Sequence, residues 1–247
     1  MREFYELVKA ATPEQRANLS KLTGSGFGDS AGTLCNHIKY LRAGSVGQLF
    51  WDKSWKQVVT DVADQIGINW QATLNGRRWK QLPTQDIENA VVTKLFQDML
   101  DKLTPEQREK IILEMKRNSD DPSVEAWLAS GGTMAVARMS GFGVYLMAST
   151  LLGALTNAIG VTLPFAVYMG MSQAIALVLG PVGWTVLAGG ILYTLNQPNW
   201  NRLALAVVYI SVIRNSLEQS EAVRQAEIKK AQQERIEFWA ARGIQVK

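Results

Sequence analysis

The chain has 247 residues, of which 47% are hydrophobic and 19% are charged, and its formal net charge is +4. This length is enough for one large or two modest domains with a true hydrophobic core. The small positive charge gives little support for nucleic-acid binding, and a single cysteine and a single histidine exclude an intramolecular disulfide and effectively exclude a conventional zinc site.

Charged residues are distributed very unevenly along the chain. Residues 1–138 hold 18 Lys+Arg and 17 Asp+Glu, residues 139–201 hold no Asp, Glu, Lys, Arg or His, and residues 202–247 hold 8 Lys+Arg and 5 Asp+Glu. This pattern predicts three parts. Residues 1–138 form a soluble amphipathic helical domain, residues 139–201 form an apolar helical hairpin, and residues 202–247 form a helix that changes from apolar to basic.

The first part shows the start and stop signals of short helices. The tetrapeptide Thr-Pro-Glu-Gln occurs at residues 12–15 and 104–107, where Thr can cap the helix, Pro suits its first position and Gln can complete a capping box. Ser54 is expected to cap a helix that Gly67 ends, and Thr84 to open another. Because no period-two pattern with turn signals appears, we predict an all-α fold.

One short motif matches an enzyme signature. Residues 28–32 read G-x-S-x-G, the nucleophile elbow of serine hydrolases, with Ser30 at its centre. That chemistry needs a preceding strand and a histidine base, but no strand is predicted and the only histidine is His37. Cys35 lies two residues before His37, on a different face of a helix, so a Cys–His dyad is not expected either. A glycine-rich loop is the better interpretation, and we predict neither an enzyme nor a cofactor.

The uncharged part divides at Gly160 and at Gly180-Pro181 into segments 139–160, 161–180 and 181–197. A membrane span needs roughly 20 apolar residues, a length that the first two segments reach. Small residues recur at four-residue spacing, which allows close helix packing in lipid. The expected packing residues of the hairpin are Ser149, Gly153, Gly170, Gly180, Pro181, Gly183 and Trp184, and the expected interfacial residues are Trp127, Trp200, Arg202 and Arg214.

The same composition has a different interpretation. Helices that are apolar on all sides also form the centre of soluble bundles, and Asn157 and Gln173 would each need a polar partner in lipid. The basic C-terminal helix could likewise lie on an anionic lipid surface or pair with another helix, and both alternatives stay open.

Several stretches are similar to the YaaW-like family of uncharacterised bacterial proteins. They are residues 55–63, Ile87-Glu88 followed by residues 103–108, residues 179–184, and the apolar segment between Arg202 and Arg214. The resemblance extends over residues 30–215. It implies an all-α protein with a glycine-rich apolar C-terminal half, and it supplies no catalytic residues. A weaker likeness, of architecture alone, is to colicin-type pore-forming domains, in which a buried hairpin inserts once the surrounding bundle opens.

We therefore expect a membrane-inserting α-helical protein, of the kind that pore-forming toxins and effectors represent. The alternative is a soluble all-α interaction or chaperone-like protein whose core is the apolar part, and a third hypothesis is an integral membrane scaffold. The expected partner is a lipid membrane, with homo-oligomers and a protein bound by the N-terminal helices as further expectations, and no nucleic acid. The N-terminus lacks the apolar core of a signal peptide, so synthesis in the cytoplasm and association with the inner membrane are predicted.

Overall fold

The protein is all-α. The structure, a computed structural model, describes residues 1–50, 53–69, 78, 81–117, 126, 141–158 and 198–240. Over these residues it contains eight helices and no strand. The helices are α1 (Arg2–Ala10), α2 (Pro13–Thr23), α3 (Ala31–Phe50), α4 (Trp55–Gln65), α6 (Thr84–Asp101), α7 (Pro105–Arg117), α9 (Gly141–Ala158) and α11 (Pro198–Ala240). This confirms the predicted fold class.

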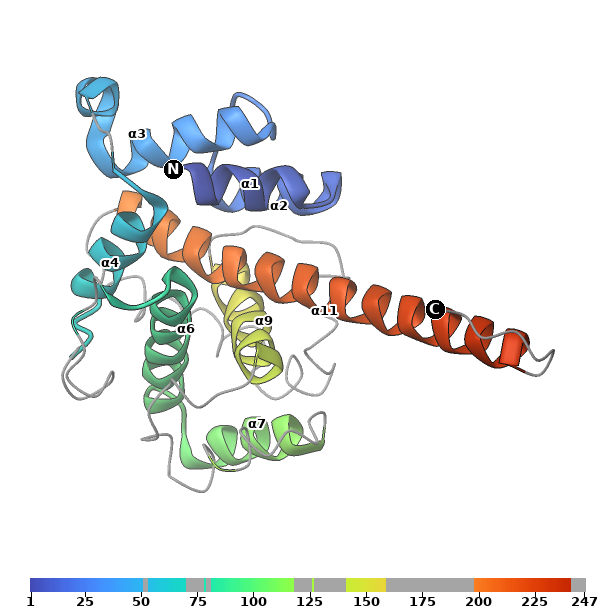
Figure 1. The fold of residues 1–247 in the computed structure, drawn as a ribbon. Coiled ribbons are helices and arrows are strands. Elements are labelled where there is room, and N and C mark those ends of the chain that lie inside the picture. The colour runs from blue at the N-terminus through green and yellow to red at the C-terminus, as the bar shows by residue number, and fades with distance from the viewer. Residues whose placement is uncertain are drawn as a thin grey trace.

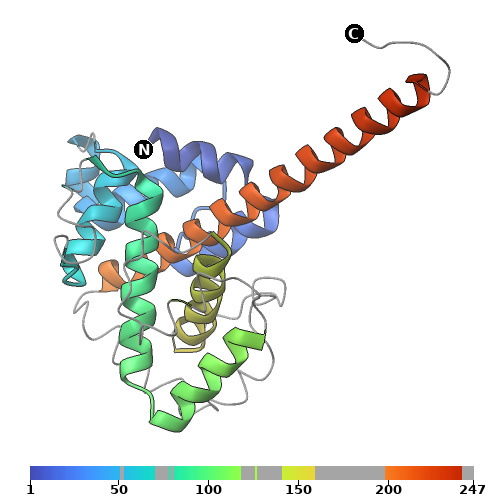
Figure 2. The ribbon, with the colours of Figure 1, turned by 60° about the horizontal axis from the view of Figure 1, so that its bottom comes forward.

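The longest helix, α11, organises the others. Its N-terminal half passes between the group α1, α2 and α3 on one side and the helices α6 and α9 on the other (Figures 1 and 2). It contacts all of these helices and also α4. With 43 residues, α11 is roughly 65 Å long, so its C-terminal half extends well beyond the body.

The predicted helix starts are confirmed at atomic detail. The Oγ1 atom of Thr12 accepts from the backbone N–H of Gln15 at 3.1 Å, and the Gln15 side chain accepts from the Thr12 N–H at 2.9 Å. The same reciprocal pair joins Thr104 and Gln107, at 3.3 and 3.1 Å. Each capping box stabilises its helix by about 1 kcal/mol. Gly67 ends α4 with φ of +72°, a conformation that favours glycine.

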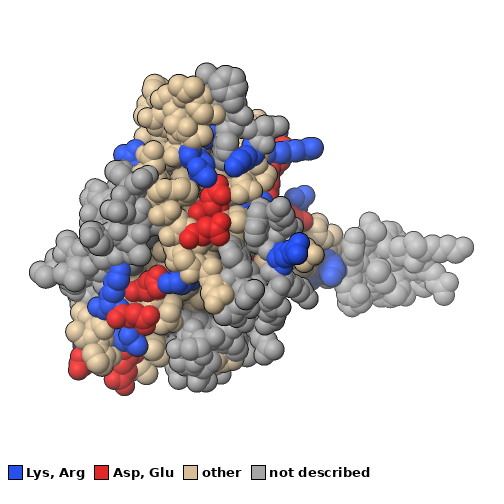
Figure 3. Space-filling view, turned by 90° about the vertical axis from the view of Figure 1, so that its left-hand side faces the viewer, with Lys and Arg blue, Asp and Glu red and all other residues tan. Residues whose placement is uncertain are grey.

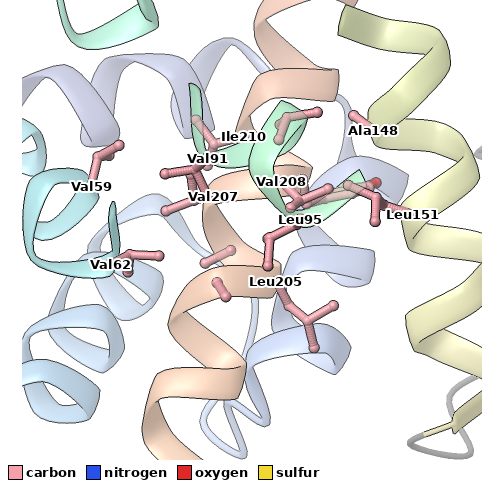
Figure 4. Close-up of a cluster of buried hydrophobic side chains, with 14 of the residues drawn as sticks. Val59, Val62, Val91, Leu95, Ala148, Leu151, Leu205, Val207, Val208 and Ile210 are labelled. Carbon is pink, nitrogen blue, oxygen red and sulfur yellow. The ribbon is translucent and has the colours of Figure 1, made fainter. Parts of the chain in front are cut away.

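The hydrophobic core lies around the N-terminal half of α11. Every residue from 203 to 213 is buried, as expected for a helical segment that is apolar on all sides. Val207, Val208 and Ile210 of α11 pack near Val91 and Leu95 of α6, while Ala148 and Leu151 of α9 and Val59 and Val62 of α4 close the cluster from either side (Figure 4). Helices from the first, second and third predicted parts thus contribute to one core.

Only the two ends of the uncharged part are described. Its first segment forms α9, and its last residues, 198–201, begin α11. No described helix combines the length and the apolar character that a membrane span requires. The hairpin itself, with Gly170, Gly180, Pro181, Gly183 and Trp184, lies outside the described residues, as does Trp127.

The part of α11 that leaves the body carries both signs of charge. Residues 216–240 hold four Lys+Arg and five Asp+Glu, and the described side chains from 218 to 230 are exposed. The positive charge predicted for the C-terminal helix therefore does not reside in this projecting segment. Two of its cationic residues, Arg202 and Arg214, instead lie against the body.

Candidate functional site

The described core contains one buried network of charged side chains. Glu88 of α6 is fully buried and accepts from Nε of Arg214 at 2.9 Å and from its Nη2 at 3.0 Å. Nε1 of Trp55 donates to the same carboxylate at 2.6 Å. Three donors on one carboxylate, two of them in the parallel geometry that guanidinium groups favour, make this the strongest polar contact between α4, α6 and α11.

The network extends to the N-terminal helix. Nη2 of Arg214 also donates to Glu3 of α1 at 2.9 Å, and the Thr84 hydroxyl donates to the other oxygen of Glu3 at 2.8 Å. Phe4, the next residue along α1, packs against Trp55 with ring centroids 4.8 Å apart. The buried ion-pair network (Glu3, Trp55, Thr84, Glu88 and Arg214) therefore joins α1, α4 and α6 to α11.

The charge states of this network depend on one another. Burial raises the pKa of the Glu88 carboxyl, and the hydrogen bonds and charge of Arg214 oppose that rise. Burial would lower the pKa of Arg214, but its hydrogen bonds and proximity to Glu88 and Glu3 raise it instead. A carboxylate so fully removed from water remains charged only while its guanidinium partner is present.

The predicted packing and interfacial residues occupy different environments. Ser149 and Gly153 are buried in α9, which packs against α6 and α11. Trp200 is partly buried and lies under the guanidinium of Arg42, 5.1 Å from its ring centroid. Of the two arginines, Arg214 is directed into the buried ion-pair network, and Arg202 is exposed at the edge of a hollow between α2, α3 and α11.

The residues of the enzyme-like motif have structural partners. The Oγ of Ser30 accepts from the backbone N–H of Thr33 at 3.1 Å, so Ser30 caps α3. His37 donates through Nε2 to the carbonyl of Thr23 at 2.9 Å, away from Ser30. Burial raises the pKa of the Cys35 thiol to about 11, which makes it a poor nucleophile at neutral pH. Residues 24–30 thus form the connection between α2 and α3, with Ser30 at the start of α3.

The described surface has mixed charge. Acidic and basic groups lie among one another over the face shown in Figure 3. Asp61 binds Arg42 at 2.7 Å, and Asp101 lies 3.5 Å from Arg108. The carboxylate pairs at 61/64 and 98/101 are therefore parts of a salt-bridged surface, and the described residues contain no cluster suited to a metal ion.

The comparisons with known proteins add no assignment. No protein-family model, no curated protein and no solved structure matches this chain. The resemblance to the YaaW-like family accordingly depends on the sequence stretches quoted above, and function has to be argued from the residues themselves.

Proposed function

We propose that this protein inserts apolar helices into a lipid membrane, and that its folded form in water encloses those helices within an amphipathic bundle. The observation that carries the proposal is the 63-residue uncharged stretch 139–201. Its first segment forms α9, which is buried in the core from 146 to 153, and its last residues begin α11 just before the buried segment 203–213. A stretch of this length at the chain's average composition would hold about 12 charged residues.

The packing of α9 and α11 supports a shielded arrangement. The described side chains from 146 to 153 of α9 and from 203 to 213 of α11 are buried, and α6, α2 and α3 cover α11. Two hydroxyls in this helix pair, those of Ser149 and Ser211, are buried without a hydrogen-bond partner. Each such group costs about 1–3 kcal/mol, which lowers the stability of the closed form.

The buried ion-pair network supplies a means of holding the closed form. Arg214 lies at the end of the fully buried segment of α11 and connects it to α1 and α6. Breaking a buried pair costs about 3–5 kcal/mol, whereas folded proteins are stable by only about 5–15 kcal/mol. Loss of this one contact would therefore shift the balance substantially toward an opened bundle.

The test is release of a trapped dye from vesicles combined with vesicle flotation, using the full chain. Vesicles of phosphatidylglycerol and phosphatidylcholine are compared with vesicles of phosphatidylcholine alone. We expect Arg214→Met to release dye faster than the wild type, because the closed form is weakened. The control Lys94→Met, at a partly exposed pair on α6, should behave as wild type. The proposal is wrong if neither wild type nor Arg214→Met floats with vesicles or releases dye.

A second pair of variants tests the uncharged stretch itself. Leu177→Lys places a charge in this stretch, which costs roughly 2.5–3.5 kcal/mol at the centre of a membrane helix. We expect dye release to fall by about a hundredfold. Gln219→Lys adds the same charge to an exposed position of α11 and should leave release unchanged. Equal release by both variants would contradict insertion of residues 139–201.

A second candidate function, helix-mediated association, is favoured by the projecting segment of α11. Val223 and Ile228 are 59% and 41% exposed there, among charges of both signs. Balanced charge with scattered apolar side chains suits pairing with another helix better than binding to an anionic surface. Light scattering after gel filtration should show a dimer that Val223→Lys/Ile228→Lys dissociates and Gln219→Lys/Gln225→Lys does not. If the wild type is monomeric at a concentration of about 100 μM, association with a second copy is contradicted. That concentration is about tenfold above a dimer Kd of roughly 10 μM.

A further inference from the structure

A hollow of about 800 Å³ lies between the loop after α2, one face of α3 and the start of α11. Its described lining residues are Gly24, Gly26, Phe27, Thr33, Asn36, His37, Tyr40 and Arg202. The four residues from α3 follow the pattern i, i+3, i+4 and i+7, so they lie on one helix face. The volume is within the range of pockets that hold small molecules, about 300–1,000 Å³.

Among the described lining residues, Arg202 alone has a permanent charge, and none is Asp or Glu. No described carboxylate forms an ion pair with this arginine, whereas Arg42, Arg108 and Arg214 each meet one. Its guanidinium lies directly over Gly24, where an added Cβ would come within 2.8 Å of Cζ. Because glycine has no Cβ, Gly24 leaves room for the guanidinium beside the hollow, and its φ of +71° also favours glycine at this position.

The remaining lining groups are aromatic rings and neutral polar groups. The rings of His37 and Tyr40 are stacked, with centroids 6.0 Å apart, and Phe27 is 90% exposed at the loop. Because a carbonyl can only accept, the bond from His37 to Thr23 places the proton on Nε2 and leaves Nδ1 as an acceptor in the neutral ring. The Asn36 amide and the Thr33 hydroxyl add further hydrogen-bonding groups.

We propose that this hollow is a binding site for a small aromatic anion, whose carboxylate or phosphate binds the guanidinium of Arg202 and whose ring packs against His37, Tyr40 and Phe27. A planar guanidinium binds such oxyanions through two parallel hydrogen bonds, and an aromatic wall adds stacking for a flat ligand. This site is separate from the buried ion-pair network and does not depend on membrane insertion.

The single histidine of the chain makes the test direct. Phenyl phosphate, benzoate and inorganic phosphate are titrated into the full chain at constant ionic strength, and the Cε1–H resonance of His37 is followed by NMR. We expect a saturable shift, with phenyl phosphate binding at least about tenfold more tightly than inorganic phosphate because only the former contains a ring.

Two variants separate the parts of the site. Arg202→Gln should weaken phenyl phosphate binding by about tenfold or more, while the control Arg224→Gln, on the projecting segment of the same helix, should bind as wild type. Tyr40→Leu should remove the preference for phenyl phosphate over inorganic phosphate. The proposal is overturned if none of the three anions shifts the His37 resonance at concentrations up to about 10 mM, which corresponds to only about 3 kcal/mol of binding free energy. It is also overturned if Arg202→Gln binds phenyl phosphate as the wild type does, or if inorganic phosphate binds as tightly as phenyl phosphate.

Discussion

Replacing Arg214 by methionine is the most informative single perturbation of this fold. Glu88 is fully buried, so the substitution leaves its carboxylate with Trp55 as its remaining described donor. Removing one partner of a buried ion pair costs about 3–5 kcal/mol. Glu3, in contrast, is 39% exposed at its side chain and can be solvated, so Glu3→Gln should cost at most about 1 kcal/mol.

The cost of Arg214→Met should depend on pH. Burial raises the pKa of Glu88, and without Arg214 nothing in the pair opposes that rise. A carboxyl whose folded-state pKa is raised binds its proton more readily in the folded than in the unfolded protein. The stability of the variant is therefore retained at pH values below the pKa of Glu88 in the unfolded protein. It is lost as the pH rises through the pKa of Glu88 in the folded protein. We therefore expect Arg214→Met to destabilise the protein less at about pH 5 than at about pH 8. The first value is near the ordinary glutamate pKa of about 4.3, and the second is well above it.

The assay is urea unfolding, followed by helix circular dichroism and by tryptophan fluorescence. Glu88→Met, Arg214→Met and the double variant form a cycle. Lys94→Gln/Asp98→Asn, at a partly exposed i,i+4 pair worth about 0.5 kcal/mol, is the control. Because two methionines fill the space of the pair without leaving a charge, the double variant should be much less destabilised than the sum of the singles. A cost of Arg214→Met below about 1 kcal/mol, or additive single effects, would refute this reasoning.

Three further predictions concern single positions. Thr104→Ala should lower stability by about 1 kcal/mol in urea unfolding, since it removes the oxygen that accepts from the Gln107 N–H, and an unchanged midpoint would contradict this. Ser211→Ala should raise the free energy of unfolding by about 1 kcal/mol, and with it the urea midpoint, because the buried hydroxyl has no hydrogen-bond partner. A lower midpoint would show that the hydroxyl does have a partner. Burial raises the pKa of Tyr209 from 10.0 to about 12, so stability should fall by about 2 kcal/mol as pH rises from 10 to 12. Tyr209→Phe should remove that loss. The ultraviolet absorbance of ionised tyrosine, followed against pH, should show the late ionisation of Tyr209 in the wild type and not in the variant.

Local signals in the sequence are sufficient to predict where α2, α4, α6 and α7 begin. Thr12, Thr104 and Ser54 each make the capping bond expected of them, because a cap is formed by residues within one turn of each other. The segment 203–213 is buried on all sides for an equally local reason, since no polar face is present to meet water.

The partners of the charged residues could not be predicted in the same way. Arg214 and Glu88 are 126 positions apart, and nothing in a single sequence links them. A signal for Glu88 was nonetheless present, because it precedes Val91 and Val92 by three and four residues and so shares their apolar face of α6. A carboxylate on such a face requires a partner in the core, and the search for one would have led to an arginine within an apolar helix.

The position of Arg214 along α11 gives the two main features of the molecule a physical connection. The segment 203–213 follows the uncharged stretch 139–201 after the single charged residue Arg202, and Arg214 is the first charged residue after that segment. The guanidinium is bound to Glu88 and Glu3, so α1 and α6 hold the end of the apolar helix here. Because the interior contacts of 203–213 are apolar and non-directional, the ion pair adds a directional contact that favours one register of α11 against α6. Under the proposed function, loss of the Glu88–Arg214 pair would weaken the hold on this end of the apolar helix and favour its release, whereas loss of the partly exposed Glu3 contact alone would have little effect.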